Sequence, residues 1–318
     1  MDISVVVPLF NEEESLPELT AWIARVMNEH NFTYEVWLVD DGSTDNSWTI
    51  VEDLAGKNPN LKGIKFQRNY GKSPALFEGF KYAAGDVVIT MDADLQDSPD
   101  EIPELYRMVK EDGYDVVSGW KQKRHDPIGK TLPSKFFNAV TRMVSGIELH
   151  DFNCGLKSYR RNVVKSIEVY GDMHRHMPLL AKWAGFRNIG EKVVEHRARK
   201  YGYSKFGVSR LVTGFLDLLS LMFVGRFGKR PMHLFGTLGT LMFFVGLGSV
   251  IYIGGMKINA LTAGIPATLV TDNPWFYIAL TTILLGTLLF VTGFLAELVV
   301  RSSADRNHYL VEKVVDHA

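Results

Sequence analysis

The sequence has only one cysteine, Cys154, in 318 residues, so it can form neither an internal disulfide nor a zinc site built on thiolates. It also lacks an excess of positive charge: the formal net charge of −1 argues against a nucleic-acid-binding protein that depends on bulk charge. No G-x-G-x-x-G motif follows the first apolar run and no G-x-x-x-x-G-K-[ST] motif occurs, so the phosphate loops of dinucleotide-binding and P-loop proteins are absent. The N-terminus has no basic stretch before its apolar run, so we expect no signal peptide.

Charged residues are also missing from two long stretches near the C-terminus. They are scattered through residues 1–230, but the runs 234–254 and 275–296 contain no Asp, Glu, Lys or Arg. A bilayer core about 30 Å thick is crossed by about 20 helical residues, and each run is long enough. We therefore predict a membrane protein with two transmembrane helices; the alternative is a pair of buried helices in a soluble core.

The flanks of these two runs predict their orientation. The basic residues on the outer sides are Arg226, Lys229 and Arg230 before the first run, and Arg301, Arg306 and Lys313 after the second. The connecting stretch 255–274 carries only Lys257 and Asp272. Because cytoplasmic flanks carry the excess of Lys and Arg, we expect both termini in the cytoplasm and the short loop outside.

The stretch 208–224 is apolar but is interrupted by Arg210 and Asp217. We interpret it as a helix in the membrane interface. A third spanning helix is the alternative, although Asp217 would then fall near its middle. The expected organisation is a cytoplasmic domain at 1–206, amphipathic juxtamembrane helices at 207–231, two transmembrane helices within 232–300 and a cytoplasmic tail at 301–318.

In the first two hundred residues, short apolar stretches alternate with stretches of helical spacing. The expected strands are 3–9, 34–39, 61–66, 86–91 and 115–119. The expected helices are 15–30, 46–56, 73–84 and 100–111. This alternation predicts an α/β fold with a mostly parallel sheet covered on both faces. Ligands bind such sheets outside the carboxyl ends of the strands, so the functional candidates are the residues that follow each strand.

Acidic residues follow two of these strands: Asp40 and Asp41 after the second, and Asp92 and Asp94 after the fourth. Each cluster has a simpler explanation, a turn with a helix cap for the first and a solvated strand end for the second. Together at one sheet edge they would repel a bare phosphate, but they suit Mg²⁺ or Mn²⁺ held between carboxylate and diphosphate. Their joint occurrence predicts a metal–diphosphate site.

Four stretches resemble, in order and spacing, the family 2 glycosyltransferases with a GT-A (Rossmann-like) fold: VVVPLFNEEESL, VDDGSTDNS, NYGKSPALFEGFKYAAGD and MDADLQDSPDEIP. Two more, DFNCGLKSYRR and RKYGYSKFG, are similar to the polyprenyl-phosphate glycosyltransferases, the branch with the dolichyl-phosphate mannose synthases and the bacterial bactoprenol glucosyltransferases. The resemblance covers essentially the whole chain. It implies inverting transfer of a hexose, with glucose from UDP-glucose expected, to polyprenyl phosphate at the cytoplasmic membrane face. The alternatives are another donor (GDP-mannose or UDP-N-acetylglucosamine) or, from a different class, a membrane receptor or pore.

The resemblance also implies which residues hold the donor. The nucleotide base and ribose are expected on Pro8, Phe10, Glu12, Asp40 and Asp41. The D-x-D-x-Q stretch is expected to approach the metal and diphosphate through Asp92, Ala93, Asp94 and Gln96, with the metal on Asp92, Asp94 and Gln96. An R-x-x-G-x-S-K loop, here Arg199, Gly202, Ser204 and Lys205, would bring cations to the diphosphate and close as a lid. A plain basic surface loop is the alternative for 197–205.

On the acceptor side, relatives use basic residues and a serine after the fifth strand. The candidates for the lipid phosphate are Lys121, Arg124, Lys130 and Ser134. This sequence has Trp120-Lys121 where relatives often have Ser-Arg. The alternative is a basic patch that lies on anionic lipid headgroups.

The ionisation of the acceptor phosphate determines whether the reaction needs a general base. A phosphate monoester has its second pKa at about 6 and is largely ionised at neutral pH, so it needs no strong general base. Asp151 occupies the usual place of a family 2 acid/base residue, and we assign it to the active site as a base or an orienting group, with a helix cap as the alternative. Cys154 is expected to be a buried small residue, not a nucleophile. A homo-oligomer, suspected to be a tetramer, is implied by the family alone, since the spans contain no G-x-x-x-G.

Overall fold

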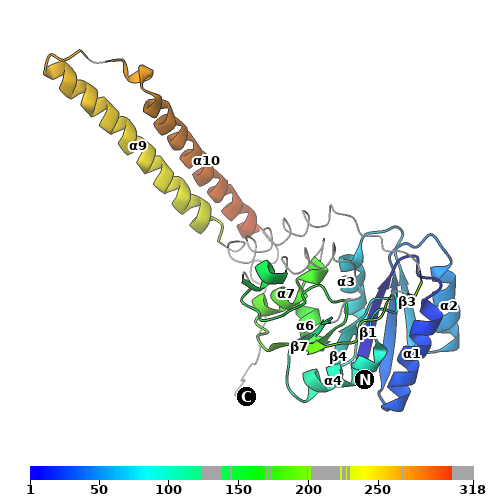
Figure 1. The fold of residues 1–318 in the computed structure, drawn as a ribbon. Helices are drawn as coiled ribbons and strands as arrows, with labels where there is room; N and C mark the ends of the chain where they lie inside the picture. The colour runs from blue at the N-terminus through cyan, green and yellow to red at the C-terminus, as the bar shows by residue number, and fades with distance from the viewer. Residues whose placement is uncertain are drawn as a thin grey trace, which may run out of the picture. The chain divides into compact units, whose positions relative to one another are not determined.

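The computed structural model describes residues 1–122, 138–143, 145–169, 171, 173–198, 200–201, 223, 227, 230–266 and 268–302 (Figure 1). The chain divides into two compact units, Met1–Leu218 and Leu219–Ala318. The juxtamembrane helices expected at 207–231 and the tail expected at 301–318 lie almost entirely outside the described residues.

The first unit is built on a seven-stranded sheet with the strand order β3-β2-β1-β4-β6-β5-β7. The strands are β1 (Ile3–Leu9), β2 (Tyr34–Asp40), β3 (Leu61–Lys65), β4 (Val87–Thr90), β5 (Val116–Trp120), β6 (Lys157–Arg160) and β7 (Ile189–Val193). Neighbouring strands are parallel except around β6, which runs antiparallel to β4 and β5. The mostly parallel α/β sheet is thus confirmed, and the ends of the five expected strands differ from the observed ends by at most one residue.

Helices cover both faces of this sheet (Figure 1). They are α1 (Leu16–Glu29), α2 (Ser47–Lys57), α3 (Lys72–Tyr82), α4 (Ile102–Lys110), α6 (Arg161–Ser166) and α7 (Met177–Trp183), with the short 3₁₀ helices η1 (Pro99–Glu101) and η2 (Met173–Arg175). Successive residues of β1 point to opposite faces: Val5 and Val7 pack in the core with α1, α2 and α4, and Val6 packs in the core with α3, α6 and α7. Burial on both sides explains why β1 is an almost unbroken apolar run.

Strand pairing brings the loops after three strands to the same edge of the sheet. Leu9, the last residue of β1, pairs with Asp40, the last residue of β2. Directly after β4, the amide of Met91 donates to the carbonyl of Val6 at 3.2 Å. The segments after β1, β2 and β4 therefore leave the sheet side by side, as expected for the carboxyl ends of parallel strands.

Two strands of the sheet are absent from the sequence-based expectation. β6 reads Lys-Ser-Tyr-Arg, and its first two residues, Lys157 and Ser158, are buried although they are polar. Such a strand has neither an apolar run nor an alternation of apolar and polar residues by which it could be recognised. Its antiparallel direction pairs Lys157 with Thr90, so the segment before β6 lies at the carboxyl edge of β4.

The second unit is a helical hairpin of α9 (Met232–Thr262) and α10 (Pro274–Ser302), with the 3₁₀ turn η3 (Val270–Asp272) between them. Both helices are long and apolar enough to cross a membrane. Their large apolar side chains are mostly exposed, for example Leu241, Ile251 and Val299. A core helix of a soluble protein would bury such residues, so α9 and α10 are candidate membrane spans.

Small residues let the two helices of the hairpin approach closely. A Cβ atom at Gly239 would lie 2.6 Å from the carbonyl oxygen of Gly286, and one at Gly286 would lie 2.7 Å from the carbonyl oxygen of Gly239. Further along, a Cβ at Gly246 would lie 2.7 Å from the carbonyl oxygen of Ala279. These positions pack backbone against backbone, the usual role of small residues between membrane helices.

Candidate active site

The loop after β2 is organised by its two aspartates. The carboxylate of Asp40 is buried, and its Oδ1 accepts the amide N–H of Ser43 at 2.8 Å. The carboxylate of Asp41 accepts the amides of Tyr70 at 2.7 Å and Gly71 at 2.8 Å, which ties this loop to the start of α3. Burial outweighs these hydrogen bonds and raises the pKa of Asp41 above its usual value.

Gly42, between these segments, cannot carry a side chain. Its φ is +72°, and a Cβ there would lie 2.4 Å from the backbone carbon of Arg68. A side chain would therefore be both strained and in collision with the backbone. The D-D-G sequence fixes the close contact between the loop after β2 and residues 68–71.

The loop after β1 is bound to the loop after β2. Asn11, at a φ of 54°, donates from its amide to the hydroxyl of Ser43 at 2.9 Å, and its side chain contacts Thr44. The amide of Glu12 donates to the hydroxyl of Ser47 at 2.9 Å. The structure thus brings two of the expected donor-binding segments together, and Pro8, Phe10 and Glu12 are all partly exposed along this edge.

The D-x-D segment follows β4 at the same edge. Asp92 forms an ion pair with Lys72 at the start of α3. Burial alone would raise the pKa of Asp92, but Lys72 and then Lys121 outweigh it and hold that pKa well below its usual value. Asp94 is buried, with a relative exposure of 9%, and its Oδ1 accepts the amide of Gln96 at 3.2 Å.

Two backbone features hold this segment in place. Leu95 has a φ of 59°, a strained conformation for a leucine, and its side chain is buried. Gly155, just before β6, lies directly against the carboxylate of Asp92, because a Cβ at 155 would be 2.4 Å from Asp92 Oδ2. The Asp92 carboxylate is therefore positioned by the segment before β6 as well as by its own loop.

The donor atoms at this edge suit a hard divalent cation. Among the described residues, no group of three or more His, Cys, Asp or Glu side chains could hold a metal ion by itself. Mg²⁺ characteristically uses one or two protein carboxylates and takes its other oxygen ligands from phosphate groups and water. Asp92 and Asp94 fit that pattern, and Lys72 already places a positive charge beside Asp92.

Asp151 lies in the segment that precedes β6. It is 1% exposed, its Oδ1 accepts the amide of Asn153 at 3.0 Å, and its carbonyl accepts the hydroxyl of Ser118 at 3.1 Å. These contacts form a turn, and the next helix along the chain starts only at Arg161, so Asp151 does not cap a helix. Burial raises the pKa of Cys154 to about 12, as expected for a structural thiol and not for a nucleophile.

The structure shows several charged contacts that the sequence did not suggest. Lys121, a candidate for the lipid phosphate, is largely buried and lies 2.7 Å from Asp97. Lys157 is buried and donates to the carbonyl of Cys154, and burial lowers its pKa. Lys72, the ion-pair partner of Asp92, was not among the expected site residues, although it stands in the N-Y-G-K stretch of the family motif at a helix start.

The remaining expected residues, Arg124, Lys130, Ser134, Arg199, Gly202, Ser204 and Lys205, lie outside the described residues. The start of the last loop is nevertheless described. Lys200 and Tyr201 both contact Glu18 of α1, at 2.6 and 3.2 Å. The chain therefore passes over the N-terminal part of α1, which follows the loop after β1.

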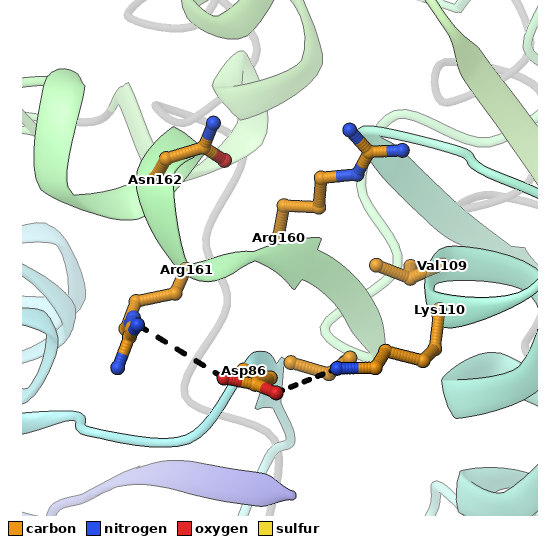
Figure 2. Close-up of a pocket in the computed structure, with 7 residues that line it drawn as sticks. Asp86, Val109, Lys110, Arg160, Arg161 and Asn162 are labelled. Atoms are coloured by element: carbon orange, nitrogen blue, oxygen red, sulfur yellow. Dashed lines mark hydrogen bonds and ion pairs between the residues drawn. The ribbon is translucent and has the colours of Figure 1, made fainter.

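A hollow of about 460 Å³ lies at the opposite edge of the sheet, at the start of β4 (Figure 2). Asp86 lies between Lys110, at 2.6 Å, and Arg161, at 4.0 Å. Arg160 points elsewhere and donates to the carbonyl of Gly113 at 2.8 Å. These are exposed, mutually neutralising groups, and none of the expected functional residues lines this hollow.

Known proteins show the family to which the chain belongs. The model of the family described as Glycosyl transferase family 2 matches residues 4–168. The chain belongs to this family and is a glycosyltransferase, as the resemblance in the sequence implied.

Relatives match almost the whole chain. Dodecaprenyl-phosphate galacturonate synthase from Rhizobium johnstonii is 34% identical over 99% of this chain and 94% of its own length. Undecaprenyl-phosphate 4-deoxy-4-formamido-L-arabinose transferase from Pseudomonas fluorescens is 33% identical over 98% of this chain and 89% of its own length. Among solved structures, glucosyl-3-phosphoglycerate synthase from Mycobacterium tuberculosis in complex with Mg²⁺ and UDP has a TM-score of 0.54 at 19% identity, covering 69% of this chain and 79% of that one. This last likeness shows the fold, a GT-A-like sheet.

Proposed function

We propose that the protein transfers a sugar from a nucleotide sugar to a polyprenyl phosphate at the cytoplasmic face of a membrane, with inversion at the anomeric carbon. The observation that carries the proposal is a family 2 glycosyltransferase domain in the same chain as two candidate membrane spans. Two relatives that match this chain over nearly its whole length are named for a polyprenyl-phosphate acceptor.

The donor roles are proposed from the geometry of the sheet edge. Pro8, Phe10, Glu12, Asp40 and Asp41 hold the base and ribose, because they lie in the two loops that hydrogen bonds join after β1 and β2. Asp92, Ala93, Asp94 and Gln96 face the diphosphate from the loop after β4. Arg199 and Lys205 approach the diphosphate from the loop that starts against α1.

Asp92, Asp94 and Gln96 are the residues that would hold Mg²⁺ or Mn²⁺. Glucosyl-3-phosphoglycerate synthase, which is similar in fold, has been crystallised with Mn²⁺ and UDP-glucose and with Mg²⁺ and UDP. When bound, the cation offsets the negative charge of the leaving nucleoside diphosphate. Asp92, kept ionised by its low pKa, is suited to this ligand role at any pH near neutral.

The acceptor phosphate is its own nucleophile in this proposal, since its second pKa of about 6 leaves it largely ionised at neutral pH. Asp151 then orients the acceptor or the sugar, from a buried turn at the same sheet edge. Arg124, Lys130 and Ser134 are proposed to hold the lipid phosphate. The same role was expected of Lys121, and its contact with Asp97 gives it a competing one.

The sugar of the donor is proposed more broadly than the sequence suggested. The expected donor, UDP-glucose, has no support from the two relatives, which are named for galacturonate and for 4-deoxy-4-formamido-L-arabinose. We propose a uridine nucleotide sugar with a hexose or a related sugar. We also propose that the chain crosses the membrane twice with both termini in the cytoplasm. Assembly into a homo-oligomer is likewise part of the proposal.

A transfer assay on isolated membranes tests the function. Membranes that contain the full chain are incubated with undecaprenyl phosphate, Mn²⁺ and, one at a time, radiolabelled UDP-glucose, UDP-galacturonate, UDP-N-acetylglucosamine and GDP-mannose, and the lipid is extracted. We expect lipid-soluble label from one donor, and none with the Asp94→Asn variant. Release of free nucleotide and sugar without labelled lipid, from every donor, would contradict a polyprenyl-phosphate acceptor.

A further inference from the structure

Lys121 and Asp97 form a buried ion pair beside the D-x-D loop. Lys121 directly follows β5, and its Nζ lies 2.7 Å from Asp97 Oδ1. The side chain of Asp97 is 0% exposed and that of Lys121 is 13% exposed, so water can screen the pair only slightly. Burial alone would lower the pKa of Lys121, but Asp97 outweighs it and raises that pKa above its usual value. Lys121 therefore keeps its charge at neutral pH.

The pair connects three segments of the donor site. Asp97 lies three residues after Asp94, in the same loop. Its backbone forms an isolated antiparallel bridge with His196, and the amide of Arg197 donates to the carbonyl of Gln96 at 3.0 Å. Residues 196 and 197 come shortly before Arg199 in the sequence, where the R-x-x-G-x-S-K stretch begins. The end of β5, the D-x-D loop and residues 196–197 thus meet at one buried charge pair.

We propose that Lys121 is a positioning residue for the donor site: through Asp97 it holds the D-x-D loop, and residues 196–197 that are bound to this loop, in place. This inference rests on the proposed function, because it assigns Lys121 to the donor half of that site. A buried carboxylate that loses its cation is strongly destabilised. The carboxylate would then turn toward water, and the turn would displace Gln96 and Asp94, which belong to the same loop.

The same geometry opposes a direct contact between Lys121 and the acceptor phosphate. To reach a phosphate, the ammonium would have to leave Asp97, and in the described part of the chain Asp97 has no other basic side chain in ion-pair contact. If Lys121 left Asp97 for a partly hydrated phosphate, the carboxylate of Asp97 would remain as an uncompensated charge in the interior. Lys121 therefore differs from a residue that binds substrate from the protein surface.

A double-mutant cycle in the full-length protein separates the two roles. The variants are Lys121→Gln, Asp97→Asn and the double variant, in which two neutral amides can hydrogen bond in place of the charges. Calorimetry with Mn²⁺ measures the affinity for UDP or GDP, whichever the wild-type protein binds, and the transfer assay gives the KM for undecaprenyl phosphate. We expect Lys121→Gln to weaken nucleotide binding about tenfold or more and to leave the lipid KM within about twofold. The double variant should recover to within about threefold of wild type.

Lys110→Gln serves as the matched control, because Lys110 forms an exposed ion pair with Asp86 at the opposite edge of the sheet and should change neither value. If Lys121→Gln does not fold, Asp97→Asn should still bind nucleotide more weakly than the double variant. A lipid KM raised tenfold with unchanged nucleotide affinity, or a double variant no better than either single variant, would overturn the inference alone. A wild-type protein that binds neither nucleotide would overturn the proposed function and this inference with it.

Discussion

Gly155 offers a way to displace a carboxylate of the D-x-D motif without removing it. A Cβ atom at this position would lie 2.4 Å from Asp92 Oδ2 and 2.6 Å from Asp92 Cγ, where ordinary contact begins at 3.4 Å. The atoms in the way belong to the end of a side chain and not to backbone. Gly155→Ala should therefore leave the fold intact and push the Asp92 carboxylate by about 1 Å, the shortfall between 2.4 and 3.4 Å.

The expected effect on activity is large and that on stability is small. A misplacement of about 1 Å at a reacting centre can cost about 10²-fold in rate, so we expect turnover to fall by about 30- to 100-fold. The main interaction disturbed is the ion pair of Asp92 with Lys72, whose side chains are 33% and 28% exposed. A pair this open to water contributes less than about 1 kcal/mol, so the free energy of unfolding should change by no more than that.

The assay is the initial rate of sugar transfer at saturating donor and lipid, repeated over a range of Mn²⁺ concentrations, together with thermal unfolding. Gly56→Ala is the matched control, because Gly56 lies in α2 and a Cβ there meets nothing within 4 Å. Gly155→Ala should need more Mn²⁺ than wild type as well as turn over more slowly. Turnover within threefold of wild type, at an unchanged Mn²⁺ requirement, would refute a metal-binding role for Asp92 in this position.

Three further predictions concern the metal, the acceptor and the hairpin. Asp94→Ala, or EDTA added to the wild-type protein, should nearly abolish transfer without unfolding the protein, and near-normal rates in EDTA would rule out the metal site. Asp151→Asn should lower turnover only partly. The fall of turnover on the acidic side of the pH profile should stay at about pH 6, because the ionisation of the lipid phosphate sets it. An inactive variant that still binds both substrates would show instead that the carboxylate is an obligatory base. Gly239→Ala forces two helix backbones apart and should destabilise the hairpin in detergent by about 1–3 kcal/mol. Gly248→Ala is the control, because a Cβ there meets nothing within 4 Å, and it should not destabilise the hairpin. Equal melting temperatures of the two variants would argue against the close packing.

The strands and the acidic loops could be predicted because their signals are local. β1 and β2 are short, mostly apolar runs; β2 ends at Asp40, and polar residues start two positions after β1, at Asn11. A parallel sheet brings the ends of such strands to one edge. The pairing of Leu9 with Asp40, the last residues of β1 and β2, shows that these two strands end at the same edge. The two candidate spans could be predicted equally well, since the absence of charge over about 20 residues depends on no distant contact.

The ion pairs at the sheet edge could not be predicted, because each depends on a partner far away in the sequence. Lys72 meets Asp92 and Lys121 meets Asp97 only after the sheet has formed. In the sequence, Lys121 belongs to a run of basic residues, and such runs are usually solvated. Its burial follows from its place at the end of an inner strand, between β6 and β7 in the sheet order.

The antiparallel strand β6 explains how two distant segments of the chain reach the same edge of the sheet. In a parallel strand, the residues that precede it lie at the amino edge, away from the carboxylates. Because β6 runs the other way, with Lys157 opposite Thr90, the preceding segment 151–155 is delivered to the edge where the D-x-D loop begins. Gly155 then packs against Asp92, and Asp151 is held in a buried turn four residues earlier. A strand with almost no sequence signal thus brings the segment of Asp151 to the sheet edge where the D-x-D loop begins, a placement that runs of apolar residues do not reveal.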